Sequence, residues 1–310
     1  MSDVPGDGGP ADLRAAALAQ MGRGLGAREL AGSEALWKDA VASGTAVPMQ
    51  TALDLPYGGH PRQRLDVFAP DAPAAGRAGR PVVLFVPGGG FTGGGKSKPE
   101  SPFHGNVGRW AAMQGWVGVV ADYRLAPGFT WPSAAEDLGL AIAWVQAHAP
   151  DFGGDPARIV LVGHSAGAAH VASYLTRRAH HAAGSAAVRA AVLLSGIYDI
   201  PAMSERPSVQ SYYGSDARLH GDRSSVMGLS ELDLPLFVAV AAEDPDGFHE
   251  QALTLLTHIQ VRRGRLPDFM VVQEHNHYTQ TFHLGSGEGE LAPALERFIR
   301  RHAGEGDAHA

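Results

Sequence analysis

The chain contains no cysteine, and this absence removes several kinds of chemistry at once. Disulfide bonds, thiolate metal ligands and cysteine nucleophiles are all excluded. Charged residues are also scarce, at 18% of the 310 residues, and 25 Lys and Arg face 32 Asp and Glu. The resulting net charge of −7 argues against a nucleic-acid surface, which requires clustered basic side chains. We therefore expect no nucleic-acid partner.

Long uninterrupted apolar runs are missing as well, so we expect no membrane span. Residues 1–10 are acidic and rich in Gly and Pro, without the basic and apolar segments of a signal peptide. A cytoplasmic location is the default expectation. The 15 His are scattered and lack a ligand spacing such as His-Glu-x-x-His, so we expect no metal and no other cofactor.

Short apolar runs alternate with helical patterns along most of the chain. This alternation predicts an α/β fold with a doubly wound, mostly parallel sheet of about eight strands and helices on both faces. The strands that the pattern locates are 64–69, 81–86, 117–121, 159–162, 190–194, 236–241 and 268–273. The helices are 11–20, 27–43, 105–114, 133–149, 166–178, 248–262 and 291–301.

The order of these segments suggests three parts. Residues 1–50 form a helical extension or cap before the first strand, and 51–303 form the catalytic domain. Residues 304–310 are expected to be a disordered tail. Residues 200–233 have no clear strand period, and we expect short helices there, over one edge of the sheet.

The most informative motif is Gly163-His164-Ser165-Ala166-Gly167, which lies between the strand 159–162 and the helix 166–178. Glycine, any residue, serine, any residue, glycine at a strand-to-helix junction is the nucleophile elbow. The turn is so tight that only glycine fits two positions before and after the serine. The motif predicts a serine nucleophile beside the first N–H groups of a helix.

A second motif, Pro87-Gly88-Gly89-Gly90-Phe91, follows the strand 81–86. Consecutive glycines let backbone N–H groups turn inward, as an oxyanion hole requires. The frame from Gly90 to Lys96-Ser97 also matches the spacing of a phosphate-binding loop. Pro99 and Pro102 argue against that reading, because they oppose the helix whose N-terminus would bind the phosphates.

An acidic segment, Glu243-Asp244-Pro245-Asp246, follows the strand 236–241. A carboxylate there can orient a catalytic histidine, because ligands and catalytic groups gather at the carboxyl ends of parallel strands. We select Asp244, with Asp246 and Glu243 as competitors. Asp246 also suits a helix cap.

Histidines follow the last strand, 268–273, where a general base must stand to reach the serine. His277 is preferred to His275, and His283 is a more distant third choice. The chain order is then serine, aspartate, histidine, which is the order of this fold's triads.

At this point the chain resembles a known family. The segments Asp-Tyr-Arg-Leu-Ala-Pro (122–127), 131–137 and Gly-Gly-Asp-Pro-Ala-Arg-Ile (153–159) join the nucleophile elbow in this resemblance. Together they are similar, over about residues 80–300, to bacterial hormone-sensitive-lipase-like carboxylesterases of the α/β-hydrolase superfamily. The segments 243–251 and 275–277 are also similar to those of kynurenine-formamidase-like members.

The resemblance implies roles for particular residues. It implies Ser165 as nucleophile, Asp244 as acid and His277 as base, with oxyanion donors from the backbone of Gly89, Gly90 and Ala166. The family usually has His-Gly-Gly-Gly, and Pro87 stands here in place of that histidine. Since the donors are backbone groups and proline stiffens a loop, we expect catalysis to survive.

The function that this implies is hydrolysis of small, soluble short-acyl or aryl esters by a serine esterase through an acyl-enzyme. Two alternatives stay open: an amidase acting on N-formyl aromatic amines, and a non-catalytic ligand receptor on the same fold. The partner is a small ester, and a homodimer is open on family analogy alone. Candidates for an apolar substrate pocket are Phe91, Trp131, Tyr198, Tyr212 and Tyr213, although aromatics are as often core residues.

Overall fold

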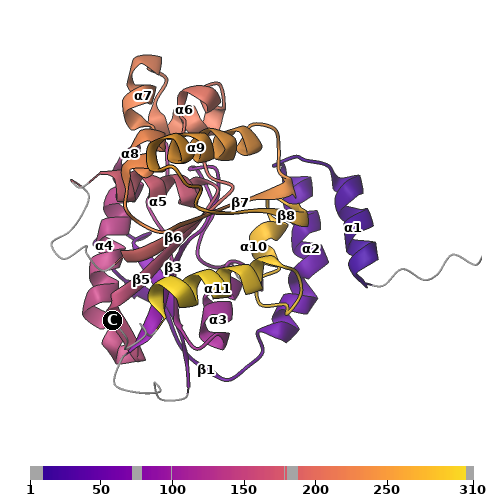
Figure 1. Ribbon diagram of the computed structural model, residues 1–310. Helices are drawn as coiled ribbons and strands as arrows, with labels where there is room; N and C mark the ends of the chain where they lie inside the picture. The colour runs from indigo at the N-terminus through magenta and orange to yellow at the C-terminus, as the bar shows by residue number, and fades with distance from the viewer. Residues whose placement is uncertain (1–9, 72–78, 99, 178, 180–187, 305–310) are drawn as a thin grey trace, which may run out of the picture.

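A computed structural model describes residues 10–71, 79–98, 100–177, 179 and 188–304. Its centre is an eight-stranded sheet in the order β1-β2-β4-β3-β5-β6-β7-β8, with helices on both sides (Figure 1). The strands are β1 Met49–Pro56, β2 Arg64–Pro70, β3 Arg80–Val86, β4 Val117–Ala121, β5 Gly154–His164, β6 Val188–Leu194, β7 Leu236–Glu243 and β8 Asp268–Asn276.

The sheet is mostly parallel, as the alternating pattern predicts. Strands β4, β3, β5, β6, β7 and β8 pair in parallel, whereas β2 pairs antiparallel with both β1 and β4. The predicted fold class is therefore confirmed. The carboxyl ends of the parallel strands meet at one edge, which is where a doubly wound fold places its site.

Two apolar layers separate the sheet from its helices. One face packs against α4 Ser133–His148, α5 Ala166–Thr176, α8 Val226–Glu231 and α9 Phe248–Arg263. The other face packs against α3 Gly105–Met113 and α11 Leu291–Ala303. Figure 1 shows the two sets of helices on the two sides of the sheet.

Small side chains bring α5 close to the sheet. A Cβ on Gly163 would lie 2.6 Å from the Cα of Ala168, and one on Gly167 would lie 2.0 Å from the carbonyl oxygen of Val86. Neither position accepts a larger residue without a backbone shift. The glycines of the elbow thus set how near the helix sits to the strands that carry the site.

Short helices span residues 200–233, as expected. They are η4 Pro201–Met203, α6 Pro207–Tyr213, η5 Ala217–Leu219, α7 His220–Arg223 and α8. Two further short elements, η1 Ala149–Phe152 and α10 Thr279–Phe282, follow α4 and β8. In Figure 1 the helices α6, α7, α8 and α9 gather at one end of the sheet.

The N-terminal helices α1 Pro10–Met21 and α2 Ala27–Gly44 lie beside β8 and α10 (Figure 1). Trp37 and Val41 of α2 pack against Phe103 and Phe282 in a small apolar cluster of their own. The division into a cap, 1–50, and a catalytic domain, 51–303, stays a prediction. Of the expected tail, residues 305–310 lie outside the described residues. No helix within the described ranges is both long and apolar enough to cross a membrane.

Candidate active site

Ser165 stands at the junction of β5 and α5 in a strained backbone conformation. Its φ is 56° and its ψ is −122°, in a region that residues other than glycine rarely adopt. Such strain persists only where the surrounding structure holds it, and it gathers at functional sites. A strained turn of this kind between a strand and a helix is what the elbow motif predicts.

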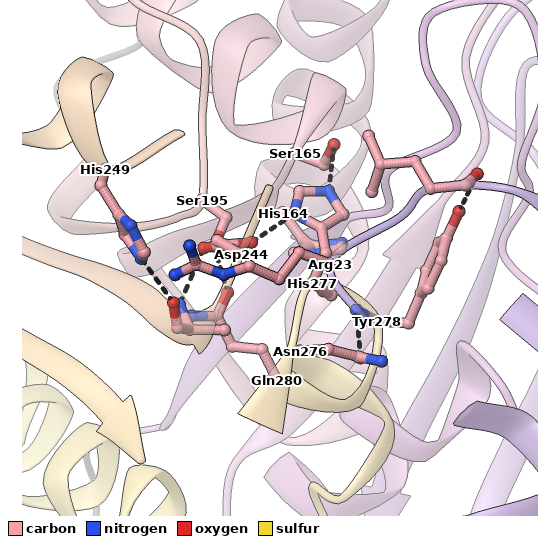
Figure 2. A network of polar contacts seen from close by, with 12 residues as sticks. Arg23, His164, Ser165, Ser195, Asp244, His249, Asn276, His277, Tyr278 and Gln280 are labelled. Atoms are coloured by element: carbon pink, nitrogen blue, oxygen red, sulfur yellow. Dashed lines mark hydrogen bonds and ion pairs between the residues drawn. The ribbon is translucent and has the colours of Figure 1, made fainter. Parts of the chain in front are cut away.

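His277 and Asp244 meet Ser165 from two other strand ends. The Nε2 atom of His277 lies 2.8 Å from Ser165 Oγ, and its Nδ1 atom lies 2.7 Å from Asp244 Oδ1. Figure 2 shows both hydrogen bonds as dashed lines on the two sides of the imidazole. Because the carboxylate accepts from Nδ1–H, Nε2 is left as the acceptor for the serine proton. The arrangement can therefore activate the serine.

The second oxygen of Asp244 is fully engaged as well. Oδ2 accepts from the N–H of Ala241 at 2.8 Å and lies 2.6 Å from the hydroxyl of Ser195. Ser195 directly follows β6 and also lies 2.9 Å from Gln280 Oε1. Sequence reasoning missed Ser195, although its position after a parallel strand was a usable signal.

The competing acids lie outside this network. The side chain of Asp246 is 94% exposed and pairs with Arg23 at 3.3 Å, whereas Asp244 is fully buried. Glu243 pairs with the same arginine at 3.4 Å. Neither competitor is placed to orient His277.

The competing histidines, His275 at the end of β8 and His283 after α10, are both buried. His275 bonds to Thr279 Oγ1 at 3.0 Å and stacks on Trp37, and His283 bonds to the carbonyl of Thr279. Burial lowers the pKa of His275 to about 2 and that of His283 to about 4. Both rings stay neutral in neutral solution, and neither contacts Ser165.

Two neighbours hold the backbone of His277. His164 lies 2.8 Å from its carbonyl oxygen through Nε2, and burial lowers the pKa of His164 well below its ordinary value. The neutral ring therefore donates from Nε2. Asn276 donates to Ser33 Oγ of α2 at 2.9 Å and accepts from the N–H of Tyr278 at 3.1 Å. These contacts set the turn that carries the base.

A cavity of about 440 Å³ opens onto Ser165 and His277. Its walls combine the glycines of the 88–95 loop with apolar side chains from three parts of the chain. Leu25 and Leu30 come from the N-terminal helical region. Phe103 comes from the segment before α3, and Phe282 is the last residue of α10. Ile197 follows β6, and Phe248 begins α9. A cavity of this kind, largely apolar with few polar groups, suits a small molecule.

Comparison with known proteins shows to which family the chain belongs. A family model described as the alpha/beta hydrolase fold matches residues 83–274, a span that includes Ser165 and Asp244. The chain belongs to this family. The resemblance that the elbow and its companion segments indicate is thereby confirmed at the level of the superfamily.

Two curated relatives come from Mycobacterium tuberculosis. The chain is 30% identical to the probable carboxylic ester hydrolase LipM over 258 residues, which is 73% of this chain and 58% of LipM. It is 37% identical to the esterase LipQ over 155 residues, 47% of this chain and 35% of LipQ. The chain thus spans less than two thirds of the length of each of these relatives.

A solved structure shows the same fold over nearly the whole chain. The hyperthermophilic esterase from the archaeon Pyrobaculum calidifontis superposes with a TM-score of 0.65. The superposition covers 94% of this chain and 96% of that one, at 20% identity. At this identity the likeness concerns the α/β-hydrolase fold alone.

The aromatic candidates for the pocket separate into one that lines the cavity and others that do not. Phe91 lies in the cavity wall. Tyr212 stacks beneath Phe91, with centroids 5.1 Å apart, and Tyr213 meets the same ring edge-on. Tyr198 is buried in the core beneath, and Trp131 lies between the guanidinium groups of Arg177 and Arg223. Of these candidates, Tyr212 and Tyr213 thus pack against Phe91 and do not line the cavity themselves.

The glycine-rich loop of this α/β-hydrolase takes a shape that side chains would forbid. Gly89 has a φ of 148°, and a Cβ there would lie 2.0 Å from the carbonyl oxygen of Gly93. Gly90 has a φ of 57°. Gly89, Gly90 and Ala166 all line the cavity beside Ser165. The loop is thus folded with its backbone against the nucleophile.

Tyr123 braces this loop at Pro87, the residue that stands in place of the family's usual histidine. Its hydroxyl donates to the carbonyl of Pro87 at 2.9 Å, within the core. Burial raises the pKa of Tyr123 far above its ordinary value, so the phenol remains a donor. A tyrosine from the strand end after β4 thus supports the loop that begins with Pro87.

Replacing Tyr123 with phenylalanine should weaken catalysis more than folding. The Tyr123→Phe variant leaves the buried carbonyl of Pro87 unpaired, at about 1 kcal/mol of stability. We expect kcat on p-nitrophenyl butyrate to fall about tenfold, because donors in the oxyanion hole act through their exact positions. The matched control is Tyr198→Phe, whose buried hydroxyl pairs with the backbone of Gly196 and not with the loop. Equal kcat values in both variants would contradict the bracing role.

The structure contradicts the alternative that Gly90 to Ser97 form a phosphate-binding loop. Lys96 is buried, and its Nζ lies 2.7 Å from Asp66 Oδ1. No helix follows Ser97 within residues 97–98 and 100–104. The lysine that would hold phosphate instead ties the loop to β2.

A histidine behind the cavity predicts a specific pH dependence of stability. His170 of α5 is buried against Phe91, Tyr123 and Tyr212, and neither ring nitrogen has a partner among the described residues. Burial lowers its pKa to about 3. The unfolded chain binds a proton below about pH 6.5 and the folded chain does not, so stability falls as the pH drops from about 7 towards 3.

The His170→Phe variant should remove this contribution. Between pH 7 and pH 5 we expect the wild type to lose about 2 kcal/mol more unfolding free energy than the variant. Urea unfolding at the two pH values measures the difference. His258→Phe, on the exposed side of α9, provides the same change of side chain at the surface. If His170→Phe and wild type lose stability equally, the buried neutral histidine is not the cause.

Proposed function

We propose that this protein is a serine hydrolase that cleaves carboxylic esters of small substrates through an acyl-enzyme. The observation that carries the proposal is the hydrogen-bonded chain Ser165–His277–Asp244 at the wall of a 440 Å³ cavity. The relatives LipM and LipQ, which are named as an ester hydrolase and an esterase, support the same reaction class.

In the proposed mechanism, His277 Nε2 removes the proton from Ser165 Oγ as the oxygen attacks the ester carbonyl. Asp244 holds the imidazole in the required tautomer and stabilises the imidazolium. The backbone N–H groups of Gly89, Gly90 and Ala166 bind the oxyanion. The alcohol leaves with the proton from His277, and water then releases the acid from Ser165 by the reverse sequence.

The cavity walls support a small acyl or aryl group as the substrate. Leu25, Leu30 and Glu34 reach the cavity from residues 1–50, in keeping with a role of this segment as a cap. Ser33 of the same segment bonds to Asn276, next to the base. We therefore propose that the N-terminal helices close the cavity and limit the length of the acyl chain.

Turnover of a short panel of substrates tests the proposal. The wild type is measured with p-nitrophenyl acetate, butyrate and octanoate and with an N-formyl aryl amine, each over a range of concentrations. We expect hydrolysis of the acetate and butyrate, slower hydrolysis of the octanoate, and esters to be preferred to the formamide.

The other readings are distinct outcomes of the same panel. Preference for the formamide would favour an amidase over an esterase. Turnover of none of the substrates, together with no labelling of Ser165 by a fluorophosphonate, would favour a non-catalytic ligand receptor. Labelling without turnover would keep the serine mechanism and point to a narrower substrate.

A further inference from the structure

The cavity wall carries one cation more than it carries anions. Its charged side chains are Lys98, Arg206 and Glu34, while the whole chain has a net charge of −7. Lys98 Nζ lies 2.7 Å from Glu34 Oε1, so these two charges neutralise one another. Arg206 forms no ion pair within the described part of the chain, and its side-chain hydrogen bond goes to a backbone carbonyl. Arg206 is thus the one charged residue of this wall without an ion-pair partner among the described residues.

The guanidinium of Arg206 is held in place by two contacts. Nη2 donates to the carbonyl oxygen of Asp246 at 2.9 Å, and the group lies over the ring of Phe248 at 5.3 Å. The backbone of Arg206 is fixed as well, because α6 begins at the next residue, Pro207. The cation is therefore positioned before any ligand arrives, which lowers the entropic cost of binding.

The position of this cation relates it to the reaction. The ring of Phe248 lies 4.4 Å from the ring of His277, centroid to centroid. One aromatic ring therefore separates the guanidinium from the catalytic base. A substrate whose ester carbonyl is at Ser165 can extend along Phe248 and reach Arg206 with a second polar group.

The chemistry of that second group follows from the guanidinium. An arginine keeps its charge at any working pH and offers a planar set of N–H donors that matches a carboxylate. A hydrogen bond between two charged groups is shorter and stronger than a neutral one.

We propose that Arg206 selects esters that carry a carboxylate in addition to the scissile bond. Candidate substrates are monoesters of dicarboxylic acids and esters of hydroxycarboxylic acids. The proposal rests on the ester hydrolysis proposed above, and it names the substrate class of that site. It also explains why one arginine on the wall of a cavity in an acidic protein has no carboxylate partner among the residues that the structure describes.

Two matched pairs of substrates test this selectivity. The first pair is 4-nitrophenyl hydrogen adipate and 4-nitrophenyl hexanoate, which places the anion on the acyl side. The second is 4-acetoxybenzoate and its methyl ester, which places the anion on the alcohol side. The readout is the ratio of kcat/KM values, anionic over neutral, in each pair, because this ratio cancels any general effect of a variant.

The Arg206→Gln variant should lower this ratio about tenfold in one of the pairs, the size expected for one charged hydrogen bond. Arg206→Lys keeps the charge but loses the planar donors, so an intermediate ratio is expected. Arg218→Gln is the control for net charge, because Arg218 is exposed, pairs with Asp216 and lies outside the cavity. Raising the salt concentration should also lower the wild-type ratio.

Binding to a protein that cannot turn over separates this inference from the proposed function. In the Ser165→Ala background, calorimetry compares the affinity for each anionic ester with that for its neutral partner, with and without Arg206→Gln. A preference for the anion that vanishes in Arg206→Gln supports the inference even if no ester is hydrolysed. Ratios and affinities that are unchanged by Arg206→Gln in both pairs would overturn it.

Discussion

Ser165→Ala should lower kcat on p-nitrophenyl butyrate by about 10⁴-fold or more. The serine oxygen is the atom that attacks the ester, and in the variant His277 has no proton to remove. Binding should change little, because the lost atom is a single hydroxyl at the edge of the cavity. The expected result is a collapse of kcat with a KM within a few-fold of wild type.

Two further measurements make this result specific. A fluorophosphonate should add its mass to the wild type and leave Ser165→Ala unmodified. Ser173→Ala serves as the control, because Ser173 lies on the same helix but contacts Trp131, outside the cavity. Unchanged turnover in a folded Ser165→Ala variant would refute the nucleophile and with it the mechanism.

The layout of the fold could be predicted from sequence because its strands differ in composition from everything around them. The later parts of β5 and β6, residues 159–162 and 190–194, are buried on both faces and appear as continuous apolar runs. β1 was missed for the opposite reason. It is an edge strand with no fully buried residue, so neither an apolar run nor a clean alternation marks it.

The candidate triad could be predicted from the sequence because the order of the strands determines where its three residues lie. Ser165, Asp244 and His277 each follow a parallel strand, and parallel strands end at the same edge. Ser195 also follows a parallel strand, whereas support from Ser33 could not be found in this way. The side chain of Ser33 meets Asn276 across 243 residues of sequence, and only the packed structure brings them together.

Residue type alone did not decide which aromatics face the cavity. Phe91 and Tyr212 are stacked on one another, yet only Phe91 is in the wall. Both are large, buried aromatic side chains. The difference depends on which ring lies on top of the other, which is set by the packing of α6 against the glycine-rich loop.

The second large loss of activity is expected from Asp244→Asn. The reason is the hydrogen bonding of Oδ2, the carboxylate oxygen that is not paired with His277. Oδ2 must accept from the N–H of Ala241, a donor that cannot rotate away. The asparagine therefore places its own oxygen there and its NH₂ group towards His277. That NH₂ donates to Nδ1 and moves the ring proton to Nε2, so the ring can no longer accept from Ser165.

We expect this tautomer to lower kcat on p-nitrophenyl butyrate by about 10³- to 10⁴-fold, while the overall geometry of the site is kept. Asp246→Asn is the matched control, because Asp246 is exposed and two residues away. It should stay within about twofold of wild type. A large loss in Asp246→Asn with little loss in Asp244→Asn would move the acid to the competitor. Loss in neither would show that His277 needs no carboxylate to act as the base.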